Sequence, residues 1–161
     1  MRGWRQWRGH AWLALGLRWY LGVVFIAASL HKIAHPQSFA LTIATYEILP
    51  LVLVNPLAIV LPYVEVFAGV MLILGLRARA AALLVLAMMV VFTIAVAVAL
   101  AQGIDASCGC FAAQSLEEDP ISWQTVARDL GWTVAALYVL LVDRRPLGLD
   151  GVIVKWRREH G

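Results

Sequence analysis

Four long apolar stretches constrain the fold of this 161-residue chain more than any other feature of its sequence. They run from about Leu17 to Ile33, from Leu57 to Leu76, from Ala80 to Ala101 and from about Thr125 to Val142. As helices they would be roughly 25 to 33 Å long, which matches a hydrocarbon core of about 30 Å. Hydrophobic residues make up 62% of the chain, too many for an ordinary soluble domain. The sequence therefore predicts an all-α integral membrane protein, a four-helix bundle.

The first stretch also has features of a secretory signal peptide. It follows an arginine-rich start, and the small residues at 27–29 resemble a cleavage site. The apolar run is long for a signal peptide, however, and Trp19 and Tyr20 beside Arg18 are typical of an anchor at the membrane surface. We therefore expect this helix to be retained.

Basic residues predict the orientation of the four helices. They gather before the first stretch, between the second and third, and after the fourth: Arg2, Arg5, Arg8, Arg18, Arg77, Arg79, Arg144, Arg145, Lys155, Arg157 and Arg158. The positive-inside rule makes these regions, and so the N and C termini, cytoplasmic, and leaves the connections 31–56 and 102–124 facing outward.

This topology suggests three parts and a location. We expect a basic, aromatic interfacial arm at 1–16, the four-helix domain at 17–142 and a basic cytoplasmic tail at 143–161. The chain would lie in a bacterial inner membrane. Its net charge of +3 suits anionic lipid head groups and does not by itself indicate nucleic acid as a partner.

The two cysteines of the chain, Cys108 and Cys110, flank Gly109 in the second outward connection. Residues two apart do not face each other along a regular helix, so the pair belongs in a turn. A disulfide across one residue closes a small strained ring, and strained exposed disulfides are easily reduced. Because the outward side of the membrane allows disulfides to persist, we expect a redox-active pair. A passive bridge, or two small buried side chains, is the structural alternative.

The same cysteines could instead bind a soft metal ion. Two thiolates from Cys108 and Cys110 and two imidazoles from His31 and His35 would provide four ligands. Histidines four apart at a membrane surface are more often solvated than ligating. We therefore expect no metal, and keep a soft-metal carrier or sensor as an alternative function.

Charged residues inside the apolar stretches are candidates for a functional site. Glu65 lies well inside the second stretch, where a carboxylate is costly unless it is paired, protonated or facing a cavity. Lys32 and Arg128 are its candidate partners, and either cation near the thiols would favour the reactive thiolate. A structural role is also open, with Glu65 bonded to Tyr63 or to a kink at Pro62. Arg128 and Asp129 could likewise form only an interfacial salt bridge.

A set of motifs along the chain resembles one membrane protein family. They are His31-Lys32-Ile33 with Pro36 and Phe39, Tyr46-Glu47-Ile48-Leu49-Pro50, Leu61-Pro62-Tyr63-Val64-Glu65 with Gly69, Cys108-Gly109-Cys110-Phe111, and Trp123 with Arg128-Asp129. From about Arg18 to Val142 the chain resembles the methylamine-utilisation MauE family, within the wider DoxX-like group of four-helix membrane proteins. Cys-Gly-Cys-Phe is the more specific element. His31 and Ala112 depart from the pattern, since relatives often have a small residue and a glycine there.

The resemblance implies thiol and disulfide chemistry outside the cytoplasm. We expect a membrane thiol-disulfide oxidoreductase, or the membrane subunit of one, in which Cys108 and Cys110 exchange electrons with a thioredoxin-like or disulfide-containing partner. A membrane quinone would be the second electron partner. Glu65 would exchange protons beside an apolar slot, with charge support from Lys32, Arg128 and Asp129; its lining would be Tyr46, Tyr63, Phe111 and Trp123. A non-catalytic maturation scaffold is a further alternative. The sequence shows no nucleotide-binding fingerprint.

Overall fold

The structure, a computed structural model, describes residues 8–46, 49–103 and 122–143, and these ranges form five helices. They are α1 (Arg8–Ala34), α2 (Pro36–Thr45), α3 (Leu51–Leu74), α4 (Ala78–Ala101) and α5 (Trp123–Val142). The described part of the chain contains no strand. Four of the helices are long and apolar enough to cross a membrane: α3, α4, α5 and the Trp12–Ala34 part of α1. The prediction of an all-α chain with four spans is therefore confirmed.

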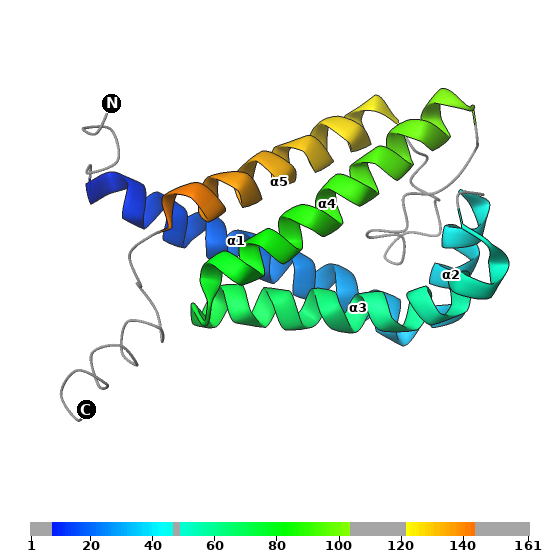
Figure 1. The fold of residues 1–161 in the computed structure, drawn as a ribbon, viewed down its shortest axis with the longest axis horizontal. Helices are drawn as coiled ribbons and strands as arrows, with labels where there is room; N and C mark the ends of the chain where they lie inside the picture. Colours follow the sequence, from blue (N-terminus) through cyan, green and yellow to red (C-terminus); the bar gives the residue numbers. More distant parts are fainter. Residues whose placement is uncertain (1–7, 47–48, 104–121, 144–161) are drawn as a thin grey trace.

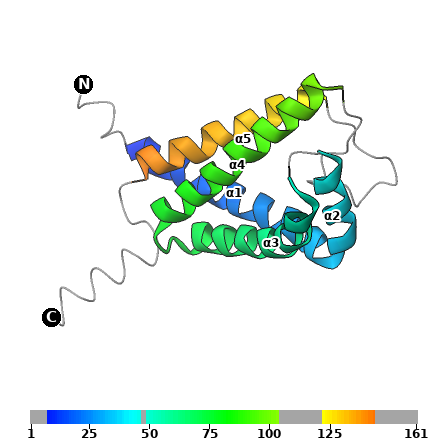
Figure 2. The ribbon, with the colours of Figure 1, turned by 45° about the vertical axis from the view of Figure 1, so that its right-hand side comes forward.

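The four long helices run alternately up and down (Figure 1, Figure 2). Helix α1 packs mainly against α3, α4 packs mainly against α5, and α1 also contacts α5. The start of α1, the turn from α3 to α4 and the end of α5 lie at one end of the bundle (Figure 1). Helix α2, the end of α4 and the start of α5 lie at the other end, which we call the α2 end. The orientation of the two ends in the membrane stays a prediction from the positive-inside rule.

Helix α2 lies in the connection 31–56, which the sequence predicts to face outward and for which it predicts no helix. Pro36 occupies its first turn, where the missing N–H of proline has no helical partner to lose. The spacing of Phe39, Thr42, Ile43 and Tyr46 is that of one helical face, and Phe39 and Tyr46 are buried. At 10 residues the helix is too short to span a bilayer, so it lies across the end of the bundle instead.

Two helices begin well before their predicted boundaries. Helix α3 begins at Leu51, not at Leu57, and continues through Pro56 and Pro62. Each proline removes one helical hydrogen bond, but ending the helix in an apolar setting would leave more backbone groups without partners. Helix α1 begins at Arg8, so residues 8–16 of the predicted arm are helical. The turn after α3 is made by Gly75, whose φ of 69° lies in the left-handed region.

Two glycines allow α1 and α3 to approach closely. A Cβ atom added to Gly22 would lie 2.9 Å from the carbonyl oxygen of Gly69, and one added to Gly69 would lie 2.9 Å from the carbonyl oxygen of Gly22. Both contacts are with rigid backbone, so neither is relieved by rotating a side chain. Small residues at such crossings are typical of helix pairs in membranes. The contact fixes the level of α1 against α3 one helical turn from Glu65.

A second set of contacts ties α1 to α5 at the end opposite α2. The buried Arg18 guanidinium Nη1 lies 3.0 Å from Oδ2 of Asp143, the residue that follows α5. One side-chain pair lies on each side of Arg18 in sequence: His10 Nδ1 is 2.6 Å from the Tyr138 hydroxyl, and Trp132 Nε1 donates to the Tyr20 hydroxyl at 3.3 Å. Arg18, counted above as a topology signal, is thus also part of the packed interior.

Replacing either glycine of the α1–α3 contact should destabilise the protein. We expect Gly22→Ala and Gly69→Ala each to lower the free energy of unfolding by about 1 to 3 kcal/mol, because the added methyl group overpacks the crossing. Gly16→Ala is the matched control, since it lies on the same helix and a Cβ atom added there would have no neighbour within 4 Å. Unfolding by SDS in mixed micelles would measure all three, and equal stabilities would contradict the close contact.

Candidate functional site

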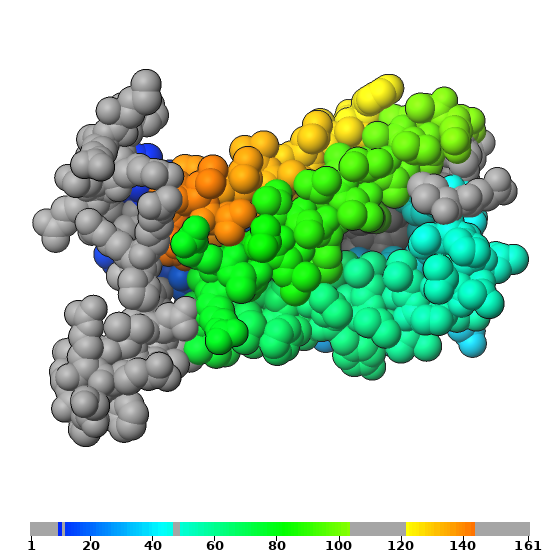
Figure 3. Space-filling model, in the orientation of Figure 1, coloured from blue at the N-terminus to red at the C-terminus, as the bar shows by residue number. Residues whose placement is uncertain are grey.

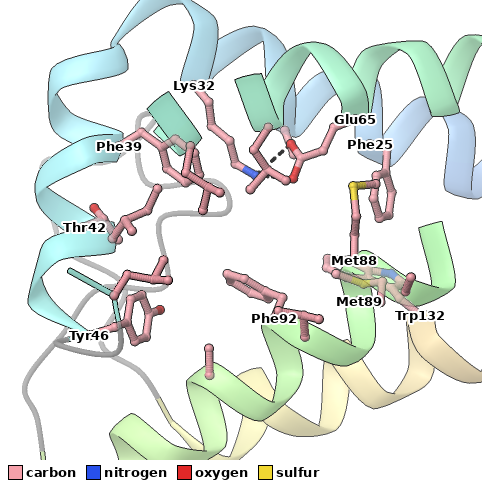
Figure 4. Close-up of a pocket in the computed structure, with 18 of the residues that line it drawn as sticks. Phe25, Lys32, Phe39, Thr42, Tyr46, Glu65, Met88, Met89, Phe92 and Trp132 are labelled. Carbon is pink, nitrogen blue, oxygen red and sulfur yellow. Dashed lines mark hydrogen bonds and ion pairs between the residues drawn. The ribbon is translucent and has the colours of Figure 1, made fainter. Parts of the chain in front are cut away.

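A cavity of about 450 Å³ lies between α1, α2, α3 and α4, with Trp132 of α5 on one side (Figure 4). Its lining is almost entirely apolar and aromatic. The polar groups come from Lys32, Thr42, Tyr46 and Glu65. Sites for small molecules and cofactors commonly have about this size, roughly 300 to 1,000 Å³, with a few polar groups in an apolar wall.

The polar centre of the cavity wall is an ion pair between α1 and α3. Lys32 Nζ donates to both carboxylate oxygens of Glu65 at 2.9 Å, and the two residues are only 6% and 8% exposed. The ring of Phe39, on α2, lies with its centroid 4.9 Å from the same nitrogen. Charges at this depth are costly unless each one is paired and hydrogen-bonded, and here both conditions are met.

A serine completes the site. The Ser29 hydroxyl oxygen lies 2.8 Å from Glu65 Oε2 and 2.6 Å from the carbonyl oxygen of Phe25. A hydroxyl carries one proton, so it donates to only one of these two acceptors at a time. If Glu65 is protonated, its own O–H can donate to Ser29 while Ser29 donates to Phe25. The geometry can therefore accommodate Glu65 with or without a proton.

Helical spacing and the glycine contact explain why these groups meet. Phe25, Ser29 and Lys32 follow one another at intervals of four and three residues, so they share one face of α1. Glu65 lies one turn before Gly69 on α3, the residue in backbone contact with Gly22. The close approach of the two helices brings the carboxylate within reach of the α1 face.

Of the two cations expected near Glu65, Lys32 is its partner and Arg128 lies elsewhere. Arg128 Nε lies 3.5 Å from Asp129 Oδ1 on α5, and its guanidinium carbon is 5.0 Å from the ring centroid of Trp132. Asp129 is fully buried within the bundle, and the alternative of an interfacial salt bridge stays a prediction. In the described part of the chain, neither carboxylate oxygen of Asp129 has a hydrogen-bond partner.

The aromatic residues predicted for the slot lie in different places. Tyr46 lines the cavity, whereas Tyr63 and Trp123 do not line it and are 59% and 72% exposed. Tyr63 comes two residues before Glu65, so the helix turns it about 200° away from the carboxylate. Trp132 instead supplies the tryptophan that lines the cavity. Phe111 lies outside the described residues.

The predicted thiol pair, Cys108 and Cys110, also lies outside the described residues. The segment that carries it leaves α4 after Gly103 and enters α5 at Ser122, the residue whose side chain caps that helix. Both attachment points are at the α2 end of the bundle (Figure 1), where the cavity and Lys32 lie as well. The topology thus tethers the cysteine segment at the end that holds the candidate site.

The histidines of the metal alternative lie side by side at the same end. The ring centroids of His31 and His35 are 4.7 Å apart. Among the residues that the structure describes, no group of three or more His, Cys, Asp or Glu side chains could hold a metal ion. Since the two cysteines are not among them, the metal alternative stays a prediction.

Several residues of the site were not identified from the sequence. Ser29 could have been found, because it lies one turn before Lys32 on the same helical face. Met88, Met89, Phe92 and Trp132 carry no such signal, because a methionine or aromatic residue in a span is equally consistent with core packing or lipid contact. Their role depends on how α4 and α5 pack against α1, which spacing alone does not reveal.

Comparison with known proteins places the chain in a family. The family described as methylamine utilisation protein MauE matches residues 10–142. The chain belongs to the MauE family. It is 34% identical over 124 residues to methylamine utilization protein MauE of Paracoccus denitrificans, covering 76% of this chain and 66% of that protein. Identity is again 34% over 121 residues to the MauE of Methylorubrum extorquens, with coverages of 74% and 64%.

This MauE-family chain thus spans slightly less than two thirds of the length of these two curated relatives. No solved structure matches it. Family membership and the four spans together identify a multi-pass membrane protein. The wider DoxX-like grouping stays a prediction.

Breaking the ion pair of this MauE-family protein on one side should cost more stability than removing it entirely. We expect Lys32→Met or Glu65→Met to destabilise the bundle by about 3 to 5 kcal/mol, because each leaves a buried charge unpaired. The double variant Lys32→Met/Glu65→Met should recover most of that loss. SDS unfolding measures the cycle, with the exposed Arg79→Met as control. Additive single effects would show that the two side chains do not act as a pair.

Proposed function

We propose that this chain is a membrane thiol-disulfide oxidoreductase, or the membrane subunit of one, that works on the extracytoplasmic side in a methylamine-utilisation system. The names of its relatives support the system, and the Cys-Gly-Cys sequence supports the chemistry. One observation carries the proposal most. The buried Lys32–Glu65–Ser29 cluster borders a cavity at the same end of the bundle where the cysteine segment is attached.

The exchange with a soluble partner would proceed through a mixed disulfide. A thiolate of the reduced pair attacks one sulfur of the partner's disulfide, so the partner's S–S bond breaks and one partner thiolate leaves. The second cysteine then attacks the mixed disulfide and closes the Cys108–Cys110 bond. The chain is oxidised, and the partner gains two electrons and becomes a dithiol. The reverse sequence of steps would oxidise the partner instead. We infer that the partner is a thioredoxin-like protein or a substrate with disulfides.

A membrane quinone would be the second electron partner. In the direction in which the partner reduces the Cys108–Cys110 disulfide, the quinone would be the acceptor, because oxidation of the dithiol releases the two electrons and two protons that reduction of a quinone to a quinol consumes. Glu65 would hold one of these protons in transit, because its hydrogen bonds with Ser29 can be satisfied with and without it. Lys32 would compensate the charge of the carboxylate each time the proton leaves.

Trapping the mixed disulfide tests the thiol step. Cys108→Ala or Cys110→Ala should leave a single thiol that stays bonded to the partner, visible as a higher-mass band on non-reducing gels and identified by mass spectrometry. In the unaltered protein, alkylation after acid quenching should show the pair switching between dithiol and disulfide. The double variant Cys108→Ala/Cys110→Ala is the control and should trap nothing.

Two results would contradict the thiol step. If the cysteine pair keeps one redox state with every electron donor and acceptor, the protein is not a thiol-disulfide oxidoreductase. Full maturation of the partner by the double cysteine variant would instead indicate a scaffold without catalysis. A soft metal that co-purifies with the protein and is lost in that variant would favour the carrier or sensor.

Substitution of Glu65 tests the proton step. Glu65→Gln keeps the size of the side chain but holds no exchangeable carboxyl proton, so reoxidation of the dithiol in membranes should slow by about 100-fold. Reduction of the pair by the soluble partner should be unaffected. Thr93→Val is the control, since its buried hydroxyl bonds to Met89 of its own helix and does not line the cavity. Equal reoxidation rates for all three proteins would exclude Glu65 from proton transfer.

A further inference from the structure

The cavity opens sideways, between α3 and α4. These helices are joined by the short turn at Gly75 and spread apart toward the α2 end (Figure 1). The space-filling view shows the surface hollowed between them (Figure 3). Leu57 on α3 and Val91 on α4, the two helices that border this hollow, line the cavity and are also 40% and 69% exposed. The cavity is therefore continuous with the outer face of the bundle.

That outer face would lie in the bilayer. Both α3 and α4 are long and apolar enough to span the membrane. Away from the opening, their exposed side chains are large and apolar, such as Ile59 and Phe67 on α3 and Leu83 and Ile94 on α4. Such surfaces on spanning helices contact lipid. A molecule that uses this opening would therefore come from the membrane and must itself be soluble in it.

The charges inside the cavity favour a neutral head group. The positive charge of Lys32 and the negative charge of Glu65 cancel, so an ionic ligand would bring an uncompensated charge into an apolar site. The Lys32 ammonium has three N–H donors, and Glu65 offers two oxygens at 2.9 Å. Among the residues that the structure describes, these two bonds leave one N–H group of Lys32 for a carbonyl oxygen of a ligand.

Aromatic side chains shape the space next to this donor. Phe39 and Tyr46 from the α2 side and Phe92 from α4 line the cavity around the Lys32 ammonium (Figure 4). Aromatic walls of this kind favour a flat, conjugated ring that can pack against them. A ring with carbonyl oxygens meets both requirements, and a long apolar tail would fit the route between Leu57 and Val91.

We infer that the cavity binds an isoprenoid quinone taken up laterally from the bilayer, with its carbonyl-bearing ring beside Lys32 and its tail leaving between α3 and α4. The inference rests on the proposed function in one respect, the identity of the bound molecule as the acceptor of the dithiol's electrons. A neutral glyceride shares the tail and the carbonyl groups. It lacks the conjugated ring and accepts no electrons.

Binding can be tested without the thiols. Decylubiquinone would be titrated into the Cys108→Ser/Cys110→Ser variant, held in nanodiscs of phosphatidylcholine, and the fluorescence of Trp132 followed as the difference from the same protein with Trp132→Phe. We expect saturable quenching, because Trp132 lines the cavity. Quenching that rises linearly with probe concentration would overturn the inference. So would equal, saturable quenching by brominated phosphatidylcholine, which would assign the cavity to ordinary lipid.

A matched pair of variants tests the lateral opening. Leu57→Phe/Val91→Phe narrows the opening from both helices and should weaken decylubiquinone binding at least ten-fold. Ile59→Phe/Ile94→Phe places the same side chains on exposed positions of the same helices that do not line the cavity, and should change binding less than two-fold. Equal affinities for the two would overturn the lateral route. If the first variant fails to fold, judged by size exclusion, Leu57→Phe alone replaces it.

The results separate this inference from the proposed function. If decylubiquinone binding is saturable and depends on the opening, but the cysteines never change redox state, the quinone site is supported and the oxidoreductase activity is excluded. If the cysteines switch redox state but decylubiquinone binding is not saturable, the thiol chemistry is supported and the quinone site is excluded.

Discussion

The buried ion pair between Lys32 and Glu65 is the interaction on which the rest of the structure depends. Two charges at this depth in a membrane bundle are stable only if their geometry is maintained. The contact of Gly22 with Gly69 holds α1 and α3 close enough for the bonds to form. Helix α2 then places Phe39 beside the ammonium group. The pairing of one lysine with one carboxylate therefore links the α1–α3 packing, the short helix at the bundle end and the wall of the cavity.

Much of the fold could be predicted from the sequence, because hydrophobicity alone determines which segments can span a bilayer. The four apolar stretches became α1, α3, α4 and α5. The beginning of α3 could not be predicted in the same way. A proline such as Pro56 usually ends a helix in water, where water hydrates the freed backbone groups. In an apolar setting those groups would have no partner, so α3 continues through the proline.

Some residues of the site could likewise be predicted from the sequence, and others could not. Lys32 and Glu65 could be singled out because a charge in an apolar span is rare and needs a partner. The cation that pairs with Glu65 could not be predicted, because Lys32 and Arg128 carry the same charge. The sequence does not show which of their helices, α1 or α5, places its cation beside Glu65 on α3. Tyr63 and Trp123 are aromatic residues that were predicted to line the slot. The helical turn places both on the outside, and packing brings in Phe92 and Trp132, which nothing in their own segments distinguishes.

A neutral ion pair also determines what kind of chemistry the cavity can support. A lone carboxylate there would attract cations, and a lone lysine would attract anions, but the pair presents donors and acceptors without net charge. Such a wall can give a proton to a neutral ligand without leaving the ligand charged, provided that the ligand takes up an electron with each proton. Electron transfer from a dithiol to a neutral carbonyl compound meets that condition, and hydride or phosphoryl transfer to charged substrates does not. The same pair that holds α1 and α3 together therefore supports, on electrostatic grounds, a proton-coupled reaction of a molecule dissolved in the bilayer.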